Sequence, residues 1–135
     1  MFSISKEFGF DAAHRLVHGY KGLCANNHGH FFGVKVFLKS ESLNKVGMVR
    51  DFKDVKLLKQ WVDDNLDHAT IVAESDEVFI KWLEDNKQRH LVIRGNPTSE
   101  NICKMLYQRA HVLGLKEVYA VEVDETCTSK ARYEA

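Results

Sequence analysis

Every second residue from 28 to 38 is apolar or a histidine, and this pattern constrains the fold more than any other stretch of the chain. It predicts a strand with one buried face, because successive side chains on a strand point to opposite faces. The face that would pack into the core carries His28, His30, Phe32, Val34, Val36 and Leu38. Any fold that buries this strand therefore also places two imidazoles side by side at the edge of its core.

A third histidine, His14, ends the segment 8–14, and a strand that pairs back on the first one would bring it close to His28 and His30. Three neutral imidazoles with one open position are the usual ligand set of a catalytic zinc site, whereas a fourth protein ligand normally closes a structural site. A His-x-His pair also occurs on ordinary strands. The residues alone therefore indicate a metal site without identifying its role.

Cys24 lies shortly before His28 and leaves two alternatives open. Its sulfur could be the fourth ligand of a closed zinc site, or a free thiol aimed at a molecule bound to the metal. The chain has three cysteines, an odd number at irregular spacing, which favours reduced thiols over a disulfide framework. Cys103 falls in a helical pattern and is expected in the core, whereas Cys127 follows a strand in a polar turn.

Length and charge exclude several classes of protein. The 135 residues predict one domain spanning 1–135, and a net charge of zero gives no basic surface for nucleic acid. No apolar run is long enough to cross a membrane, and residues 1–6 lack the apolar core of a signal peptide. We expect a cytoplasmic protein with neither a membrane nor a nucleic acid as partner.

Hydrophobic periodicity predicts two strands, then helices, then two strands. We expect strands at 2–10, 28–38, 116–125 and 130–133, a brief strand at 90–93, helices at 51–66, 76–86 and 98–113, and a loop at 11–28. This order predicts an α+β fold in which a four-stranded antiparallel sheet carries helices on one face. Phe31 and Phe37 would lie on the other face, so we expect sister subunits to cover it.

Six short motifs occur in an order that resembles the 6-pyruvoyl-tetrahydropterin synthase family over nearly the whole chain. They are Phe10-Asp11-Ala12-Ala13-His14, Cys24-x3-His28-Gly29-His30, Met48-Val49-x-Asp51-Phe52, Leu66-Asp67-His68, Pro97-Thr98-Ser99-Glu100-Asn101 and Glu125-Thr126. The spacing of three residues between Cys24 and His28 resembles that in the bacterial 6-carboxytetrahydropterin synthases of queuosine biosynthesis. The resemblance implies a tunnelling fold, in which sheets join around a trimeric β-barrel, two trimers stack as a homo-hexamer, and active sites lie between subunits.

The resemblance also implies a role for each matching residue. His14, His28 and His30 would be the zinc ligands, Cys24 the catalytic thiol, and Asp67 and His68 the pair that works beside it. Glu125 would grip the guanidine-like edge of a pterin, with Thr98 and Ser99 as weaker contacts to the ring. From the residues alone, Asp67 and His68 read as a polar helix end rather than a catalytic pair. A carboxylate beside Val121 and Val123, in contrast, needs a donor-rich partner.

By resemblance the substrate is 7,8-dihydroneopterin triphosphate, and the products are 6-carboxy-5,6,7,8-tetrahydropterin, acetaldehyde and triphosphate. Zinc would act as a Lewis acid on the substrate hydroxyls, Cys24 as the base, and His68 as a proton carrier. Arg15, Lys21 and Arg132 are candidates for the triphosphate, although each could be an ordinary surface charge. Asp124 and Cys127 depart from the residues expected around Glu125. Two alternatives remain: a pyruvoyl-forming enzyme, or a non-catalytic module with a structural zinc site that three histidines and Cys24 close.

Overall fold

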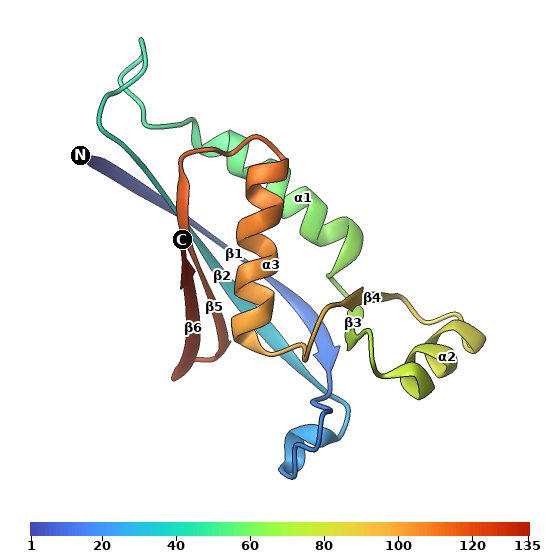
Figure 1. Cartoon of the computed structure of the whole chain (residues 1–135). Helices are drawn as coiled ribbons and strands as arrows, with labels where there is room; N and C mark the ends of the chain where they lie inside the picture. The colour runs from blue at the N-terminus through green and yellow to red at the C-terminus, as the bar shows by residue number, and fades with distance from the viewer.

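The computed structural model describes residues 1–135 and consists of a curled six-stranded sheet with three α-helices (Figure 1). The strands are β1 (Phe2–His14), β2 (His28–Ser40), β3 (Ala69–Ala73), β4 (His90–Ile93), β5 (Val118–Thr126) and β6 (Ser129–Glu134). The α-helices are α1 (Lys56–Asn65), α2 (Glu77–Asp85) and α3 (Ser99–Val112), with short 3-10 turns η1 (Leu23–Ala25) and η2 (Phe52–Val55). Along the sheet the strands lie in the order β4-β3-β1-β2-β5-β6.

The antiparallel hairpin of β1 and β2 forms the centre of the sheet. Its register pairs Phe10 with Phe32 and continues to His14 opposite His28, so β1 is longer than the expected 2–10. The expected loop at 11–28 is therefore wrong for residues 11–14, and the connection runs only through residues 15–27. This extension matters because it fixes the third histidine on a strand beside the other two.

One face of this sheet packs against α1 and α3, which lie side by side in front of it in Figure 1. The predicted inward face of β2 is confirmed, since Phe32, Val34, Val36 and Leu38 are all buried in the main core. The helices contribute Leu58, Val62, Ile102, Leu106 and Ala110 to the same core. Truncation of such fully buried side chains to alanine costs about 2–5 kcal/mol of stability.

The helix starts follow the expected capping chemistry. The Asp51 side chain accepts a hydrogen bond from the backbone NH of Lys53 at the start of η2, which leads into α1. The Thr98 hydroxyl accepts from the NH of Asn101 at the start of α3. Gly114 has φ +88° just beyond the end of α3, a conformation that favours glycine.

The sheet differs from the expected four-stranded antiparallel arrangement at one edge. There β3 pairs parallel with β1, and β4 pairs parallel with β3. Helix α2 also departs from the expectation of helices on one face, because its Phe79 and Leu83 pack on Val72 of β3 in a separate small cluster. Ile71, the neighbour of Val72, faces the main core, so Val72 and α2 lie on the opposite face of β3.

The face of β1 and β2 turned away from α1 and α3 carries exposed aromatic surface. The side chain of Phe31 is 65% exposed, and Phe37 is half-buried beneath the guanidinium of Arg132. We call this the outer face. None of the three α-helices has both the length and the apolar character needed to cross a membrane.

Candidate functional site

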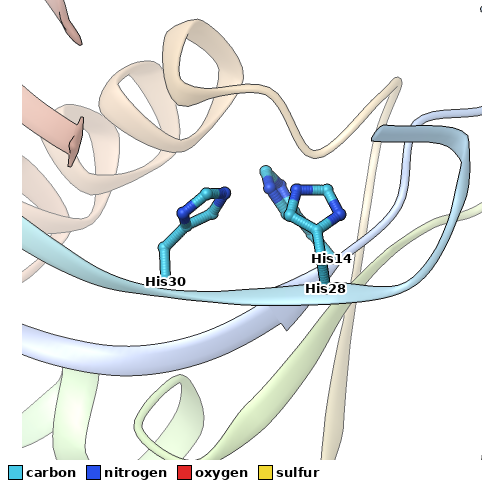
Figure 2. A group of neighbouring side chains, drawn as sticks. All are labelled: His14, His28 and His30. Carbon is cyan, nitrogen blue, oxygen red and sulfur yellow. The ribbon is translucent and has the colours of Figure 1, made fainter. Parts of the chain in front are cut away.

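Three imidazoles converge at one end of the central hairpin. His14 comes from β1, and His28 and His30 rise from β2 on the same side of that strand (Figure 2). A ring nitrogen from each histidine lies within 4.8 Å of the ring nitrogens of the other two. The period of two in β2 and the pairing of His14 with His28 together produce this arrangement, as the sequence predicted.

Backbone carbonyls orient two of the three rings. Nδ1 of His14 lies 2.6 Å from the carbonyl oxygen of Pro97, and Nδ1 of His28 lies 2.7 Å from that of Asn26. Because a carbonyl only accepts, each Nδ1 must carry the hydrogen, which leaves Nε2 with a lone pair. Metal-binding histidines are usually held in this way by a hydrogen bond from the other ring nitrogen.

The Nε2 atoms of His14, His28 and His30 are all buried, and none has a hydrogen-bond partner. Buried polar atoms without partners are rare, because each forfeits its hydration without compensation. Burial also lowers the pKa of His14, so its imidazole is held neutral, as a metal ligand must be. The donor set therefore fits a metal ion, and three nitrogen ligands are typical of zinc.

Glu125, at the end of β5, lies against this cluster from one side. Its Oε1 is 3.3 Å from Nε2 of His14 and 3.7 Å from Nε2 of His30, which are ion-pair distances without the geometry of hydrogen bonds. Glu125 also lines a cavity of about 180 Å³, together with Thr98 and Ser99. The three residues expected to contact a substrate ring thus share one cavity, and that cavity adjoins the imidazoles.

The hydroxyl of Thr98 already has a structural task, since it caps α3. Ser99 is the first residue of α3 and contributes to the same cavity wall. Lys130 and Glu100 also line the cavity. A ligand in this cavity would therefore meet carboxylates, a cation and the amino end of a helix.

Cys24 lies on η1, within the connection between His14 and His28, and is half-buried. It does not belong to the group of ligand atoms formed by the three imidazoles. This arrangement favours the free thiol over the closed zinc site among the two alternatives. Cys103 is buried as expected, and burial raises the pKa of its thiol to about 12, whereas Cys127 is exposed.

Asp67 and His68 occupy the turn between α1 and β3. Oδ1 of Asp67 accepts from the backbone NH of Asp11 at 3.0 Å, and Oδ2 accepts from Nδ1 of His68 at 2.9 Å. These two hydrogen bonds, the backbone bond first, lower the pKa of the Asp67 carboxyl. His68 has φ +58°, an uncommon conformation for histidine, and its side chain is exposed.

The Asp67–His68 pair and the three imidazoles lie on opposite faces of the sheet. The carboxylate of Asp11 lies close to the side chains of Asp67 and His68. On β1, Asp11 and His14 are an odd number of positions apart, so their side chains point to opposite faces of the sheet. The neighbour of Asp11, Ala12, faces the main core with the imidazoles and pairs with Ala69 of β3. The residue before Ala69, His68, therefore shares the outer face with Asp11.

Two of the three cations suggested for a triphosphate are engaged elsewhere. Arg15 forms a two-point ion pair with the buried carboxylate of Asp76. Arg132 lies on the outer face, where it bonds Glu122 and Glu134. Lys21 is exposed on the connection between β1 and β2.

Sequence reasoning missed the backbone groups that orient the site. The carbonyls of Pro97 and Asn26 and the NH of Asp11 leave no side-chain signal, because every residue carries such groups. It also missed Asn96, whose amide makes two hydrogen bonds to the backbone of Val17. An Asn-Pro pair reads as an ordinary turn, so only the tertiary structure shows this contact.

Comparison with known proteins bears on this site. A profile of the family described as 6-pyruvoyl tetrahydropterin synthase matches residues 3–135. A relative from Synechocystis sp., named 6-carboxy-5,6,7,8-tetrahydropterin synthase, is 36% identical over 138 residues, covering 98% of this chain and 93% of the relative. A relative of the same name from Rickettsia typhi is 36% identical over 104 residues, covering 76% of this chain and 75% of the relative.

Solved structures agree in fold. An uncharacterised protein from Wolinella succinogenes superposes with a TM-score of 0.84 at 28% identity, over 98% of this chain and 97% of that chain. The 6-pyruvoyl tetrahydropterin synthase of Caenorhabditis elegans has a TM-score of 0.75 at 24% identity, over 99% of this chain and 95% of that chain, and supports the fold alone. With the family profile and the two relatives in agreement, the chain belongs to the 6-pyruvoyl tetrahydropterin synthase family of enzymes.

Proposed function

We propose that this chain is a zinc-dependent 6-carboxy-5,6,7,8-tetrahydropterin synthase. It converts 7,8-dihydroneopterin triphosphate and water to 6-carboxy-5,6,7,8-tetrahydropterin, acetaldehyde and triphosphate, as a step toward queuosine. The names of the relatives support the product class. The observation that carries the proposal is the group of three buried, unpartnered Nε2 atoms beside a cavity lined by Glu125.

His14, His28 and His30 would hold the zinc ion through Nε2. When bound, the ion supplies Lewis acidity, which makes a carbon next to a coordinated hydroxyl easier to deprotonate. The chain's part is to keep these nitrogens neutral and correctly directed. Burial of His14 and the carbonyls of Pro97 and Asn26 do this.

Glu125 would bind the amino-pyrimidine edge of the pterin. That edge presents adjacent N–H donors, which suit a carboxylate acceptor in a part-buried site. Because Glu125 also lies against His14 and His30, a ring held by this carboxylate keeps its side chain close to the imidazoles. Thr98 and Ser99 would complete the wall around the ring.

Cys24 would remove a proton from the substrate side chain, and His68 would deliver or accept one at Nε2. Asp67 supports this role, because its carboxylate binds Nδ1 of His68 and fixes the ring, while the other oxygen is held by Asp11. Within one chain, the Asp67–His68 pair and the imidazole cluster lie on opposite faces of the sheet. Cys24 and His68 can therefore act on one substrate only if the Asp67–His68 pair of one sheet reaches the imidazole cluster of another. A second copy of the chain supplies this geometry.

We infer a homo-oligomer, arranged as two stacked trimers, in which each site is shared between copies. In support, β1 pairs with β3 only over residues 12–14, so most of the edge of β1 that is turned away from β2 has no partner strand. The outer edge of β6 has none either. Pairing β6 of one copy with β1 of the next would close a barrel and bury these edges, together with the exposed Phe31.

A pyruvoyl-forming activity is the second candidate, because the family profile carries that name. The two reactions differ in a volatile product. Carboxytetrahydropterin formation releases acetaldehyde, whereas the pyruvoyl product retains those carbons.

The deciding experiment is incubation of the zinc-loaded and chelated protein with 7,8-dihydroneopterin triphosphate, followed by identification of products. We expect acetaldehyde in equal amount to carboxytetrahydropterin, only with zinc. His90→Ala is a matched control, since His90 lies on β4 outside the imidazole cluster. Turnover without acetaldehyde would favour the pyruvoyl product, and no turnover by the zinc-loaded protein would refute the proposal.

A further inference from the structure

The connection that carries Cys24 begins with residues 15–17, and side chains from other parts of the chain hold the first and the third of them. The first is Arg15, whose guanidinium donates to both carboxylate oxygens of Asp76, at 2.7 and 2.6 Å. Asp76 is buried, and the same guanidinium stacks on the ring of Phe79 at 4.4 Å. A two-point, charge-assisted pair of this kind fixes direction as well as distance. The position of Arg15 is therefore set by the start of α2.

The third of these residues, Val17, is held by Asn96. The NH of Val17 donates to Oδ1 of Asn96 at 2.8 Å, and Nδ2 of Asn96 donates to the carbonyl of Val17 at 3.0 Å. The amide of Asn96 thus satisfies both backbone groups of Val17, as a neighbouring strand would. Asn101 of α3 steadies the arrangement by donating from Nδ2 to the carbonyl of Asn96 at 2.8 Å.

Leu16, between the two anchored residues, connects them to the thiol. Its NH donates to the carbonyl of Cys24 at 2.8 Å. Among the backbone hydrogen bonds outside helices and strands, this is the one that joins residues 15–17 to η1. The place of Cys24 therefore depends on residues 15–17, and these depend on Asp76 and Asn96.

The same turn that holds Val17 also holds a metal-ligand candidate, since Pro97 follows Asn96 and its carbonyl accepts from His14. His14 and the Cys24 connection differ in what else holds them, however. His14 pairs with His28 on one side and with Ile71 on the other, so its backbone stays fixed by two strands. The Cys24 connection has no such strand pairing. Loss of the Asn96 amide should disturb the thiol much more than the imidazoles.

We propose that Asn96 is a positioning residue, which sets the place of the Cys24 thiol relative to the three imidazoles through its paired hydrogen bonds to Val17. The inference rests on the proposed function, because it takes Cys24 as the group that removes a proton. Positioning of a reacting group to within about 1 Å can change the rate of a step by about 100-fold. Asn96 would thereby control turnover without touching the substrate or the metal.

The test uses the zinc-loaded protein in a Cys127→Ser background, so that Cys24 is the only accessible thiol. In Asn96→Ala we expect zinc content to match the parent, kcat to fall at least about tenfold, and KM to stay within about twofold. The rate of Cys24 alkylation by iodoacetamide should change as well. Asn96→Asp keeps the acceptor for the Val17 NH but loses the donor, so its kcat should be intermediate.

Asn65→Ala is the matched control, because it removes one side-chain bond to a backbone carbonyl, that of Trp61 at the end of α1. We expect parental kcat and alkylation there. If Asn96→Ala does not fold, Asn96→Asp replaces it, since it removes only the donor to the Val17 carbonyl, and it should lower kcat with zinc retained. Unchanged kcat and alkylation, or zinc lost in step with kcat, would overturn the proposal. Failure of the proposed function would look different, since the zinc-loaded parent would then show no turnover at all. Turnover kept in Cys24→Ala would instead remove the catalytic role of the thiol.

Discussion

The carbonyl oxygen of Pro97 accepts a hydrogen bond from Nδ1 of His14 at 2.6 Å, although 83 positions separate the two residues in sequence. This bond selects the tautomer of a buried imidazole and leaves its Nε2 free to bind a metal. The metal-site hypothesis thus depends on a contact between the end of β1 and the turn before α3. The predictions below follow from this geometry and from the separation of the two candidate catalytic groups.

Removal of one imidazole should abolish metal binding, whereas removal of the thiol should not. We expect His28→Ala to lower zinc affinity more than about 100-fold, because loss of an outer partner alone costs about 10–100-fold. Cys24→Ala should retain stoichiometric zinc, since Cys24 lies outside the imidazole group. Metal analysis after dialysis against a competing chelator measures both. Zinc lost from Cys24→Ala would identify the sulfur as a ligand.

Chelation should inactivate the protein without unfolding it. The main core contains 22 buried apolar residues, and their packing stabilises the fold with or without a metal ion. Zinc binding adds stability only through its preference for the folded state. Far-ultraviolet circular dichroism at 25 °C should therefore stay the same after chelation, with a lower Tm. Cooperative unfolding at that temperature would instead favour a structural zinc.

The three cysteines should differ in reactivity. The thiol of Cys103 is buried with a pKa of about 12, so little thiolate exists at pH 8. Iodoacetamide followed by peptide mass spectrometry should show modification at Cys24 and Cys127 but not at Cys103 in the folded protein. Urea-unfolded protein serves as the control and should be modified at all three. Rapid labelling of Cys103 under native conditions would contradict the packing described here.

Asp67 should contribute stability that depends on pH in a defined direction. Its folded-state pKa lies below the ordinary 3.8, so the ionised carboxylate is favoured in the folded protein. The contribution is complete above that value and is lost as pH falls through the folded pKa. The stability difference between wild type and Asp67→Asn in urea should therefore shrink below pH 3.8. Asp64→Asn, on the exposed side of α1, is the matched control.

Local patterns in the sequence predicted a large part of the fold and of the metal cluster. Period-two alternation gave the inward face of β2 and hence the common side of His28 and His30. Capping at Asp51 and Thr98 was predictable because the hydrogen bonds span only two or three residues. These features depend on neighbours in sequence, which is why pattern reasoning found them.

Features set by distant parts of the chain were not predictable. All five residues of β3 are buried, so the strand shows no alternation and was missed. The end of β1 was also missed, because Ala12 and Ala13 give no contrast between faces. Without the pairing of β1 with β3, nothing indicated that His68 lies on the outer face. The separation of the Asp67–His68 pair from the imidazoles therefore emerged only from the structure.

Mixing two inactive variants tests most directly whether one site is built from two copies. We expect His28→Ala and His68→Ala each to be inactive alone, since each damages a different half of the site. Unfolded together in equal amounts and refolded with zinc, they should regain about one quarter of wild-type activity. In a random assembly each half of a site is intact about half of the time, so both halves are intact in about one quarter of the sites. His28→Ala mixed with His30→Ala should regain none. Absence of activity in the first mixture, with mixed oligomers shown by native mass spectrometry, would contradict the shared site.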